Sequence, residues 1–419
     1  MWLVVKKFIL AMLLPIVGLF SFPAQESSTD LPVAPPGALL QPAVPQPGMR
    51  AGGLESDPAK GRAEANSSAP APSAAAVKEC LAKPMGTSSA CLDALFRKYL
   101  ATHSTGEALA ILRGFEESDS QLRLSCHPVV HAVGRETFRI QRTVYDSFAA
   151  CDQTCHSGCY HGAMERFLRG DLAESEARHI TLEELKNKST SACDPGQATR
   201  FRFQCLHGLG HAVVFFSDYK LGQALSICDA LLDGWSRSSC YGGAFMENVF
   251  SATPEKRDLS ATDYHYPCSA LPEKYKSDCY MMQTTRMSEM GLLTEKLFGE
   301  CRNAGSHVHT CMQSIGRDLS NDARIGDPAL VAKKCGFGNG AEREACTRGV
   351  VYALIDNTWD GRYAFPFCAS YADPADATYC FSASVNYLRA TFEKGQGEIT
   401  RQCGVYVPQS QLCRDAALY

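Results

Sequence analysis

The sequence has no block of basic residues and little net charge of either sign. Its 419 residues include 41 Lys and Arg against 45 Asp and Glu, which gives a formal net charge of -4. Proteins that bind nucleic acid usually gather Lys and Arg into a patch or a stripe. The balance of charge therefore argues against a nucleic-acid partner. No nucleotide-binding motif is present either.

Aromatic residues are absent from residues 25–76, which are rich in Pro, Ala, Gly and Ser instead. Such a composition cannot bury enough apolar surface to offset the entropy that is lost on ordering the chain. We therefore predict a disordered spacer over residues 25–76. The folded part is expected to follow it, over residues 77–419.

A short charged and apolar segment precedes the spacer. Lys6 and Lys7 lead into an apolar run that ends at Phe22. At about fifteen residues, this run is shorter than the roughly 17 to 25 that span a bilayer, and its layout is that of a signal peptide. Because cleavage prefers a small residue where Phe22 stands, we predict either a signal peptide or an uncleaved signal anchor over residues 1–24. In both cases we expect an exported chain, periplasmic or extracellular, and an uncut segment would anchor it to the membrane.

Cysteines recur at a regular spacing through the predicted folded part. Those that open a predicted helix follow one another at a period of about 34 residues, over nine steps. They are Cys91, Cys126, Cys159, Cys205, Cys240, Cys279, Cys311, Cys346, Cys380 and Cys413. This periodicity is typical of helix-pair repeats, whose units bury their apolar faces only against a neighbour. We therefore predict an all-α fold, an αα-solenoid of about nine helix pairs.

A second cysteine closes most units, about ten to twelve residues before the next opening cysteine. This regularity predicts one local disulfide for each such pair. The pairs are Cys80 with Cys91, Cys193 with Cys205, Cys228 with Cys240, Cys268 with Cys279, Cys301 with Cys311, Cys335 with Cys346, Cys368 with Cys380, and Cys403 with Cys413. In the chain-entropy model, each disulfide that closes such a loop raises the free energy of unfolding by roughly 3 kcal/mol. Disulfides persist in oxidising compartments, which agrees with export.

Four cysteines remain after this pairing, namely Cys126, Cys151, Cys155 and Cys159. Cys126 with Cys155 and Cys151 with Cys159 would complete the set, although the crossed alternatives stay open. Cys151, Cys155 and the histidine after it look like a haem-attachment motif, but one residue too many separates the two cysteines. We therefore expect no covalently bound haem.

In its period, export and cysteine placement, the stretch 77–419 resembles the Sel1-like and tetratricopeptide class of helix-pair solenoids. The likeness is greatest to exported Sel1-like proteins that carry one disulfide per repeat. The spacing between cysteines is longer here, and the small and aromatic consensus residues of those repeats are not matched. The resemblance implies a solenoid architecture and, loosely, a role in binding or as a scaffold.

Histidines gather in the first half of the predicted solenoid, where seven of the eleven lie between residues 126 and 211. In two of the three opening helices there, two histidines lie four residues apart, and in the third a glutamate follows a histidine at that spacing. Residues four apart share a helix face, and packed helices lie about 8 to 10 Å apart. The side chains that we expect to converge are His127, His131, His161, Glu165, His207 and His211.

Imidazole and carboxylate groups are the preferred ligands of zinc, copper and non-haem iron. The pattern therefore predicts a transition-metal site, and six ligands are enough for two ions. Neither His-x-x-x-His motif has the glutamate that a His-Glu-x-x-His protease uses as its base. Whether the protein is an enzyme stays open, with Glu165 and Glu247 as weak candidates for a proton acceptor.

A metal-free interpretation stands beside this prediction. The position two residues after the opening cysteine holds residues as different as His161, Gln313, Arg348 and Ser382, so it accepts polar groups generally. The histidines could then simply face a solvated groove, and Glu247 could lie on a solvated face. In that case the protein would be a scaffold that binds peptide, protein or cell-envelope partners along the concave face of the solenoid.

Overall fold

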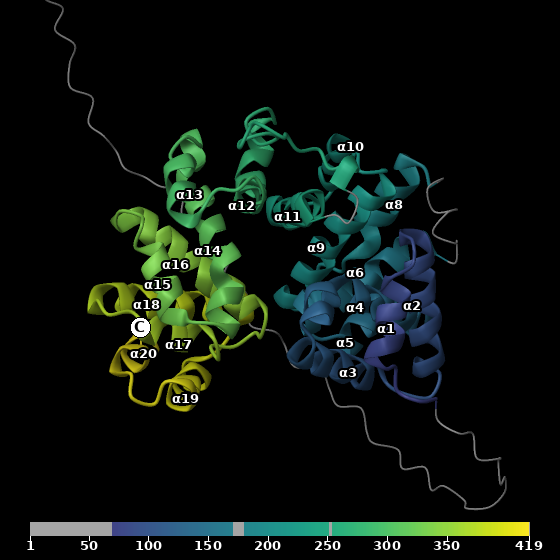
Figure 1. Ribbon diagram of the computed structural model, residues 1–419, viewed down its shortest axis with the longest axis horizontal. Coiled ribbons are helices and arrows are strands. Elements are labelled where there is room, and N and C mark those ends of the chain that lie inside the picture. Colours follow the sequence, from purple (N-terminus) through teal and green to yellow (C-terminus); the bar gives the residue numbers. More distant parts are fainter. Residues whose placement is uncertain (1–68, 171–179, 251–253, 419) are drawn as a thin grey trace, which may run out of the picture. The chain divides into compact units, whose positions relative to one another are not determined.

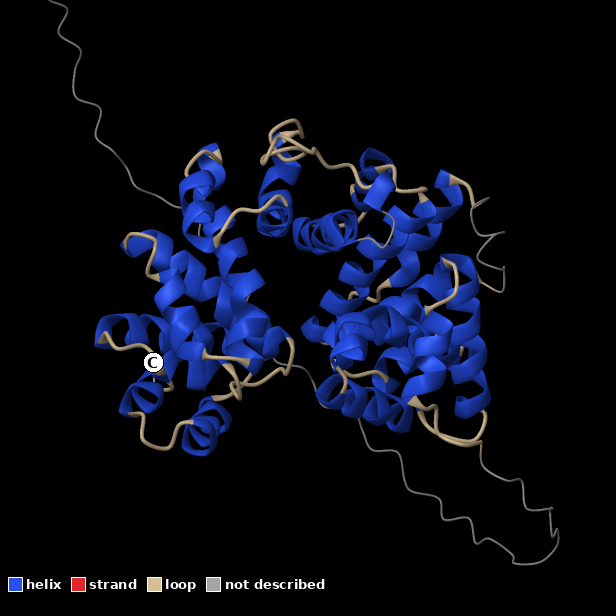
Figure 2. Cartoon of the chain, in the orientation of Figure 1, coloured by secondary structure: helices blue, strands red, loops and turns tan. Residues whose placement is uncertain are grey.

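The computed structural model describes residues 69–170, 180–250 and 254–418. These residues form helices and loops without any β-strand, which confirms the all-α prediction (Figures 1 and 2). The predicted segment 1–24 and the spacer up to residue 68 lie outside the described residues. Helix α1 begins at Ala74, inside the C-terminal end of the predicted spacer. None of the helices in the described ranges combines the length and the apolar character that a membrane crossing requires.

Long helices that carry the opening cysteines alternate for most of the chain with shorter ones. The α-helices are α1 (Ala74–Leu81), α2 (Met85–Leu100), α3 (Thr105–Ser118), α4 (Ser120–Gln141), α5 (Val144–Ala150), α6 (Thr154–Arg169), α8 (Leu182–Ala192), α9 (Thr199–Phe216), α10 (Leu221–Cys228), α11 (Gly234–Phe250), α12 (Glu273–Glu289), α13 (Thr294–Cys301), α14 (Val308–Ile325), α15 (Pro328–Cys335), α16 (Gly340–Asp356), α17 (Ala364–Ala369), α18 (Pro374–Phe392), α19 (Gln396–Tyr406) and α20 (Gln411–Ala416). Two short 3-10 helices, η1 (Pro254–Lys256) and η2 (Gly305–His307), lie in the connections.

Most of the disulfides join the end of one helix to the long helix that follows it. The ten bonds link Cys80 to Cys91, Cys126 to Cys155, Cys151 to Cys159, Cys193 to Cys205, Cys228 to Cys240, Cys268 to Cys279, Cys301 to Cys311, Cys335 to Cys346, Cys368 to Cys380 and Cys403 to Cys413. Eight are the pairs that the spacing predicts, and the other two match the first of the alternatives for the remaining four cysteines. So many disulfides suggest an oxidising, exported environment.

The opening cysteines lie inside their helices, and the expectation that each helix starts at its cysteine is wrong. α16 shows why: the helix begins several residues before Cys346, because Asn339 provides a polar N-cap there. The Asn339 side chain accepts from the backbone N–H of Glu342, whose carboxylate accepts in return from the backbone N–H of Asn339. A helix begins where the N–H groups of its first turn find hydrogen-bond acceptors. The position of the cysteine along the helix is set instead by the apolar core in which its side chain is buried.

Removing this cap is expected to destabilise the protein modestly. Asn339→Ala should lower the free energy of unfolding by about 1 kcal/mol, because a backbone N–H of α16 loses its acceptor. Arg302 donates two hydrogen bonds to the Glu342 carboxylate and would still hold it. Urea unfolding would measure the loss, with Asn339→Asp as the matched control that keeps an acceptor. Equal stability of the alanine variant and the parent would show that the cap is dispensable.

The long helices touch one another in chain order. The contacts run from α2 to α4, α6, α9, α11, α12, α14, α16 and α18, and the last of these contacts the short helix α20. Three neighbouring pairs come especially close, and each does so at two glycines. These are Gly134 and Gly162 between α4 and α6, Gly210 and Gly243 between α9 and α11, and Gly316 and Gly349 between α14 and α16. A Cβ atom on any of these glycines would collide with backbone of the facing helix, so the backbones themselves are in contact.

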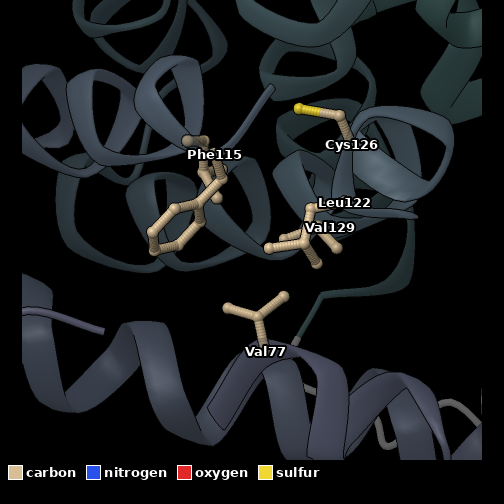
Figure 3. A pocket seen from close by; sticks show the side chains of 6 residues that line it. Val77, Phe115, Leu122, Cys126 and Val129 are labelled. Atoms are coloured by element: carbon tan, nitrogen blue, oxygen red, sulfur yellow. The ribbon is translucent and has the colours of Figure 1, made fainter. Parts of the chain in front are cut away.

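Apolar side chains fill the space between the helices in one continuous core. One small gap in it, shown in Figure 3, lies between α1, α3 and α4 and is lined by Val77, Phe115, Leu122, Cys126 and Val129, together with Leu112. No charged side chain or hydroxyl group lines this gap. It is therefore part of the packing and offers no group for chemistry.

Candidate metal centre

Five histidines from three consecutive long helices converge. His127 and His131 come from α4, His161 from α6, and His207 and His211 from α9. Their ring nitrogens form two groups of three, the first with His127, His131 and His161 and the second with His161, His207 and His211. Within each group one nitrogen per residue lies within 4.8 Å of the others. The histidines therefore lie close together in the structure, but in two groups that share His161 and not around one common point.

The hydrogen bonds of the first group fix where its protons lie. His127 Nδ1 is 2.9 Å from the carbonyl oxygen of Cys155, and a carbonyl can only accept, so this nitrogen carries a proton. His131 Nδ1 is 2.8 Å from Glu165 Oε1 and donates to that carboxylate. In both rings Nε2 is therefore the nitrogen that can offer a lone pair to an ion when the ring is neutral.

These lone pairs point at each other across a short distance. His127 Nε2 lies 3.1 Å from His131 Nε2 and 3.3 Å from His161 Nδ1. Two bare lone pairs repel at such a separation unless a proton or a cation lies between them. Ligand nitrogens bound at 2.0 to 2.1 Å around a tetrahedral ion are themselves about 3.3 Å apart. The spacing of the first group thus matches one face of a coordination sphere.

The second group contains two buried nitrogens that have no hydrogen-bond partner, His161 Nε2 and His211 Nε2. His211 Nδ1 donates to Glu247 Oε2 at 2.9 Å, so its Nε2 is again the nitrogen with the lone pair. The ring of His207 stacks on Phe203 with the centroids 5.5 Å apart. A buried polar atom without a partner is costly, and in native proteins such atoms call for an explanation.

Burial favours the neutral form of three imidazoles in this cluster, those of His161, His207 and His211. Desolvation lowers the pKa of His207 and that of His211 to about 3, with nearby histidines adding to the effect. The pKa of His161 is lowered well below its usual value, first by burial and then by its neighbours, His211 foremost. A neutral imidazole keeps the lone pair that coordinates a metal, so these rings are in the ligating form at neutral pH.

Glu165 is held in place by a buried ionic network. Arg135 Nη1 donates to Glu165 Oε2 at 2.7 Å and Arg135 Nε donates to Asp93 Oδ1 at 2.9 Å, while Glu165 Oε1 accepts from His131. Burial opposes the charge of Glu165, but Arg135 and His131 outweigh it and lower the pKa of the carboxyl group. Both oxygens of Glu165 are therefore engaged, one with a ring N–H and one with a guanidinium.

Glu247, the second candidate proton acceptor, lies on α11 and pairs with His211. Burial raises the pKa of Glu247 to about 7, and the nearby charge of Glu165 adds to the rise. The side chain nevertheless keeps 20 % of its surface exposed, and Tyr219 Oη donates to its Oε1 at 3.4 Å. In this position it resembles Glu165, because each glutamate accepts a hydrogen bond from the Nδ1–H group of one histidine.

The structure thus brings together all six side chains that the sequence singled out, and it adds Glu247. The residues that hold them were not predicted from the sequence. They are Arg135, Asp93 and the carbonyl group of Cys155. A signal for Arg135 was available, because it stands four residues after His131 and so shares its helix face. His156, expected in a loop, belongs to the first turn of α6.

One further group of candidate ligands carries no metal chemistry. Glu116 lies near the sulfur atoms of Cys126 and Cys155, but these two cysteines form a disulfide with each other. A disulfide sulfur has no thiolate to offer an ion. The histidine cluster is therefore the candidate metal centre among the described residues.

Comparisons with known proteins add no assignment to this geometry. No family model matches the chain, and searches of curated proteins and of solved structures found no significant match. The likeness to Sel1-like repeats accordingly rests on period, export and cysteine placement alone.

Proposed function

We propose that this protein is an exported transition-metal-binding protein whose ligands are the imidazoles of His127, His131, His161, His207 and His211. Glu165 and Glu247 would orient the rings of His131 and His211. Carboxylates that accept the second N–H of a ligating histidine fix its tautomer and raise its basicity, as is common around protein-bound metals. The proposal modifies the ligand set expected from the sequence, in which Glu165 was itself a ligand.

The observation that carries this proposal is the close approach of the ring nitrogens within each of the two groups of three histidines. In the first group the Nδ1 atoms of His127 and His131 donate to the carbonyl group of Cys155 and to Glu165, and the two Nε2 atoms face each other at 3.1 Å. In the second group, His161 Nε2 and His211 Nε2 are buried without a hydrogen-bond partner, which is costly unless an ion binds there. A cation held between the nitrogens of each group would be coordinated by imidazole ligands.

The ligand chemistry favours zinc or copper over non-haem iron. Both suit a site built from imidazoles, whereas the common non-haem iron site takes one carboxylate directly as a ligand beside two histidines. Here both glutamates are engaged with ring N–H groups instead. Calcium and magnesium prefer oxygen ligands and fit the cluster poorly.

The architecture that supports this function belongs to the same proposal. We infer that units of about 34 residues stack as an αα-solenoid over residues 77–419, with about nine helix pairs. Consecutive contacts among the long helices, together with the local disulfides, support this inference. The signal segment 1–24 would direct export, and the spacer 25–76 would separate the solenoid from the membrane if the segment remains uncut.

Zinc binding by the full mature chain, purified without a His-tag and with its disulfides intact, tests the proposal. We expect zinc to remain bound after gel filtration and to raise the melting temperature, because a ligand that binds only the folded state stabilises it. His161→Ala should lose this retained zinc, since His161 belongs to both groups. His307→Ala is the matched control: His307 pairs with Glu273 in another part of the fold and should not affect binding.

Two results would count against metal binding. One is parent protein that retains no zinc or copper and does not change its melting temperature in their presence. The other is a His161→Ala variant that keeps its fold by circular dichroism and binds as the parent does. Either result would favour the metal-free scaffold, whose partners could then be sought among peptides, proteins and cell-envelope components.

A further inference from the structure

The five histidines are arranged in two groups of three that share one residue. Among the described residues, the nitrogens converge in threes and not as a single group of five. The ring of His161 lies between the other four, with centroid distances of 5.1 and 5.5 Å to His127 and His131, and of 5.8 and 4.4 Å to His207 and His211. A single ion could not reach ligands that are spread over both groups.

His161 can serve both groups because its two nitrogens lie on different edges of the ring. Its Nδ1 is 3.3 Å from His127 Nε2, in the first group. Its Nε2 is buried without a partner, as is His211 Nε2 in the second group. The side chain of His161 is itself buried, with 2 % of the residue exposed, so water does not satisfy these atoms from outside.

Each group also has a carboxylate of its own. Glu165 accepts a hydrogen bond from His131 in the first group, and Glu247 accepts one from His211 in the second. Two divalent ions close together repel strongly at low dielectric, and nearby negative charge offsets that cost. The repeated structure explains the duplication, because α4 with α6 and α9 with α11 are the same close glycine-mediated helix pair.

We propose that the cluster holds two transition-metal ions that share His161, one bound through its Nδ1 and the other through its Nε2. This inference rests on the proposed function and specifies its stoichiometry. When the second ion binds, the neutral ring of His161 releases its one N–H proton to solvent and becomes an imidazolate. Two nitrogen–metal bonds then form on this ring, and no electron is transferred. His127 and His131 would complete the first site, and His207 and His211 the second.

Copper(II) is a suitable probe, because all cysteines are in disulfides and no thiol is present to reduce it. The full mature chain without a His-tag would be titrated with copper(II), and bound copper and the electron paramagnetic resonance signal would be recorded together. We expect two copper ions per chain. The signal should grow up to about one equivalent and then fall as the second ion binds, because an imidazolate bridge couples the two spins antiferromagnetically.

Variants would locate the two sites. His127→Ala and His207→Ala should each retain about one copper ion with an uncoupled signal, while His307→Ala should behave as the parent does. Parent protein that binds one ion, or two ions whose signals simply add, would overturn the shared-histidine arrangement and leave the proposed function standing. Parent protein that binds no copper and no zinc would overturn both. The parent alone decides between these outcomes if a variant fails to fold.

Discussion

Gly316→Ala is expected to lower the free energy of unfolding by about 3 kcal/mol, the upper part of the range for overpacked sites. A Cβ atom at this position would collide with the carbonyl oxygen of Cys346 and would lie 2.9 Å from the backbone nitrogen of Val350. These are backbone atoms of a packed helix, so α14 and α16 can accept the new methyl group only by moving apart. The loss would be measured by chemical unfolding under non-reducing conditions.

Gly114→Ala is the matched control for this substitution. Gly114 also lies inside a helix, α3, but no atom stands within 4 Å of the position that its Cβ would take. Alanine there should stabilise the protein by roughly 0.5 to 1 kcal/mol, because glycine is a poor helix former. If both variants changed stability by the same amount, helix propensity alone would govern these positions, and the close approach of α14 and α16 would have no energetic importance.

The parts of the fold that the sequence predicts are those set by local spacing. Cys335 and Cys346 stand close along the chain, and so do the other seven pairs of this kind, so helix ends and disulfides follow from counting residues. The starts of the long helices do not follow from the cysteines. They depend on capping groups such as Asn339, which lie upstream and are placed by the turn that precedes the helix.

The candidate site also has a part that could be predicted from the sequence and a part that could not. Helical spacing places His127 beside His131 and His207 beside His211, and the stacking of neighbouring units brings the pairs together, so the histidines could be predicted. The groups that accept hydrogen bonds from their ring N–H groups could not be predicted. The carbonyl of Cys155 reaches His127 because Cys155 has a positive φ of 53°. This is a local departure from right-handed helical geometry at the start of α6, and it cannot be predicted from the sequence.

Ion pairs between residues far apart in the sequence are the other feature of the candidate site that could not be predicted. Arg135 on α4 meets Asp93 on α2 and Glu165 on α6, so its role depends on the register of three helices at once. A charge four residues from a histidine predicts a shared face, but it does not say which carboxylate on a neighbouring helix will oppose it. That choice is fixed only when the backbones pack, as they do here at Gly134 and Gly162.

Arg135→Ala is expected both to destabilise the fold and to weaken metal binding. Removing the guanidinium leaves the carboxylates of Asp93 and Glu165 largely buried without their main counter-charge, which should cost about 3 kcal/mol of unfolding free energy. Glu165 would also lose the contact that fixes it beside His131. Partners of this kind typically change metal affinity by about 10-fold to 100-fold, so zinc affinity should fall within that range while His131 itself remains.

Arg139→Ala separates this positioning role from a general loss of charge. Arg139 lies one turn further along α4 and pairs with Glu136, which Arg97 also holds through two hydrogen bonds, so its removal should cost less than about 1 kcal/mol and leave zinc affinity unchanged. Zinc affinity is best measured well below the melting temperature of the weaker variant, where each chain is folded. If Arg135→Ala lost stability yet bound zinc as tightly as the parent, Arg135 would be a purely structural residue, and the orientation of His131 would not depend on the anchored Glu165.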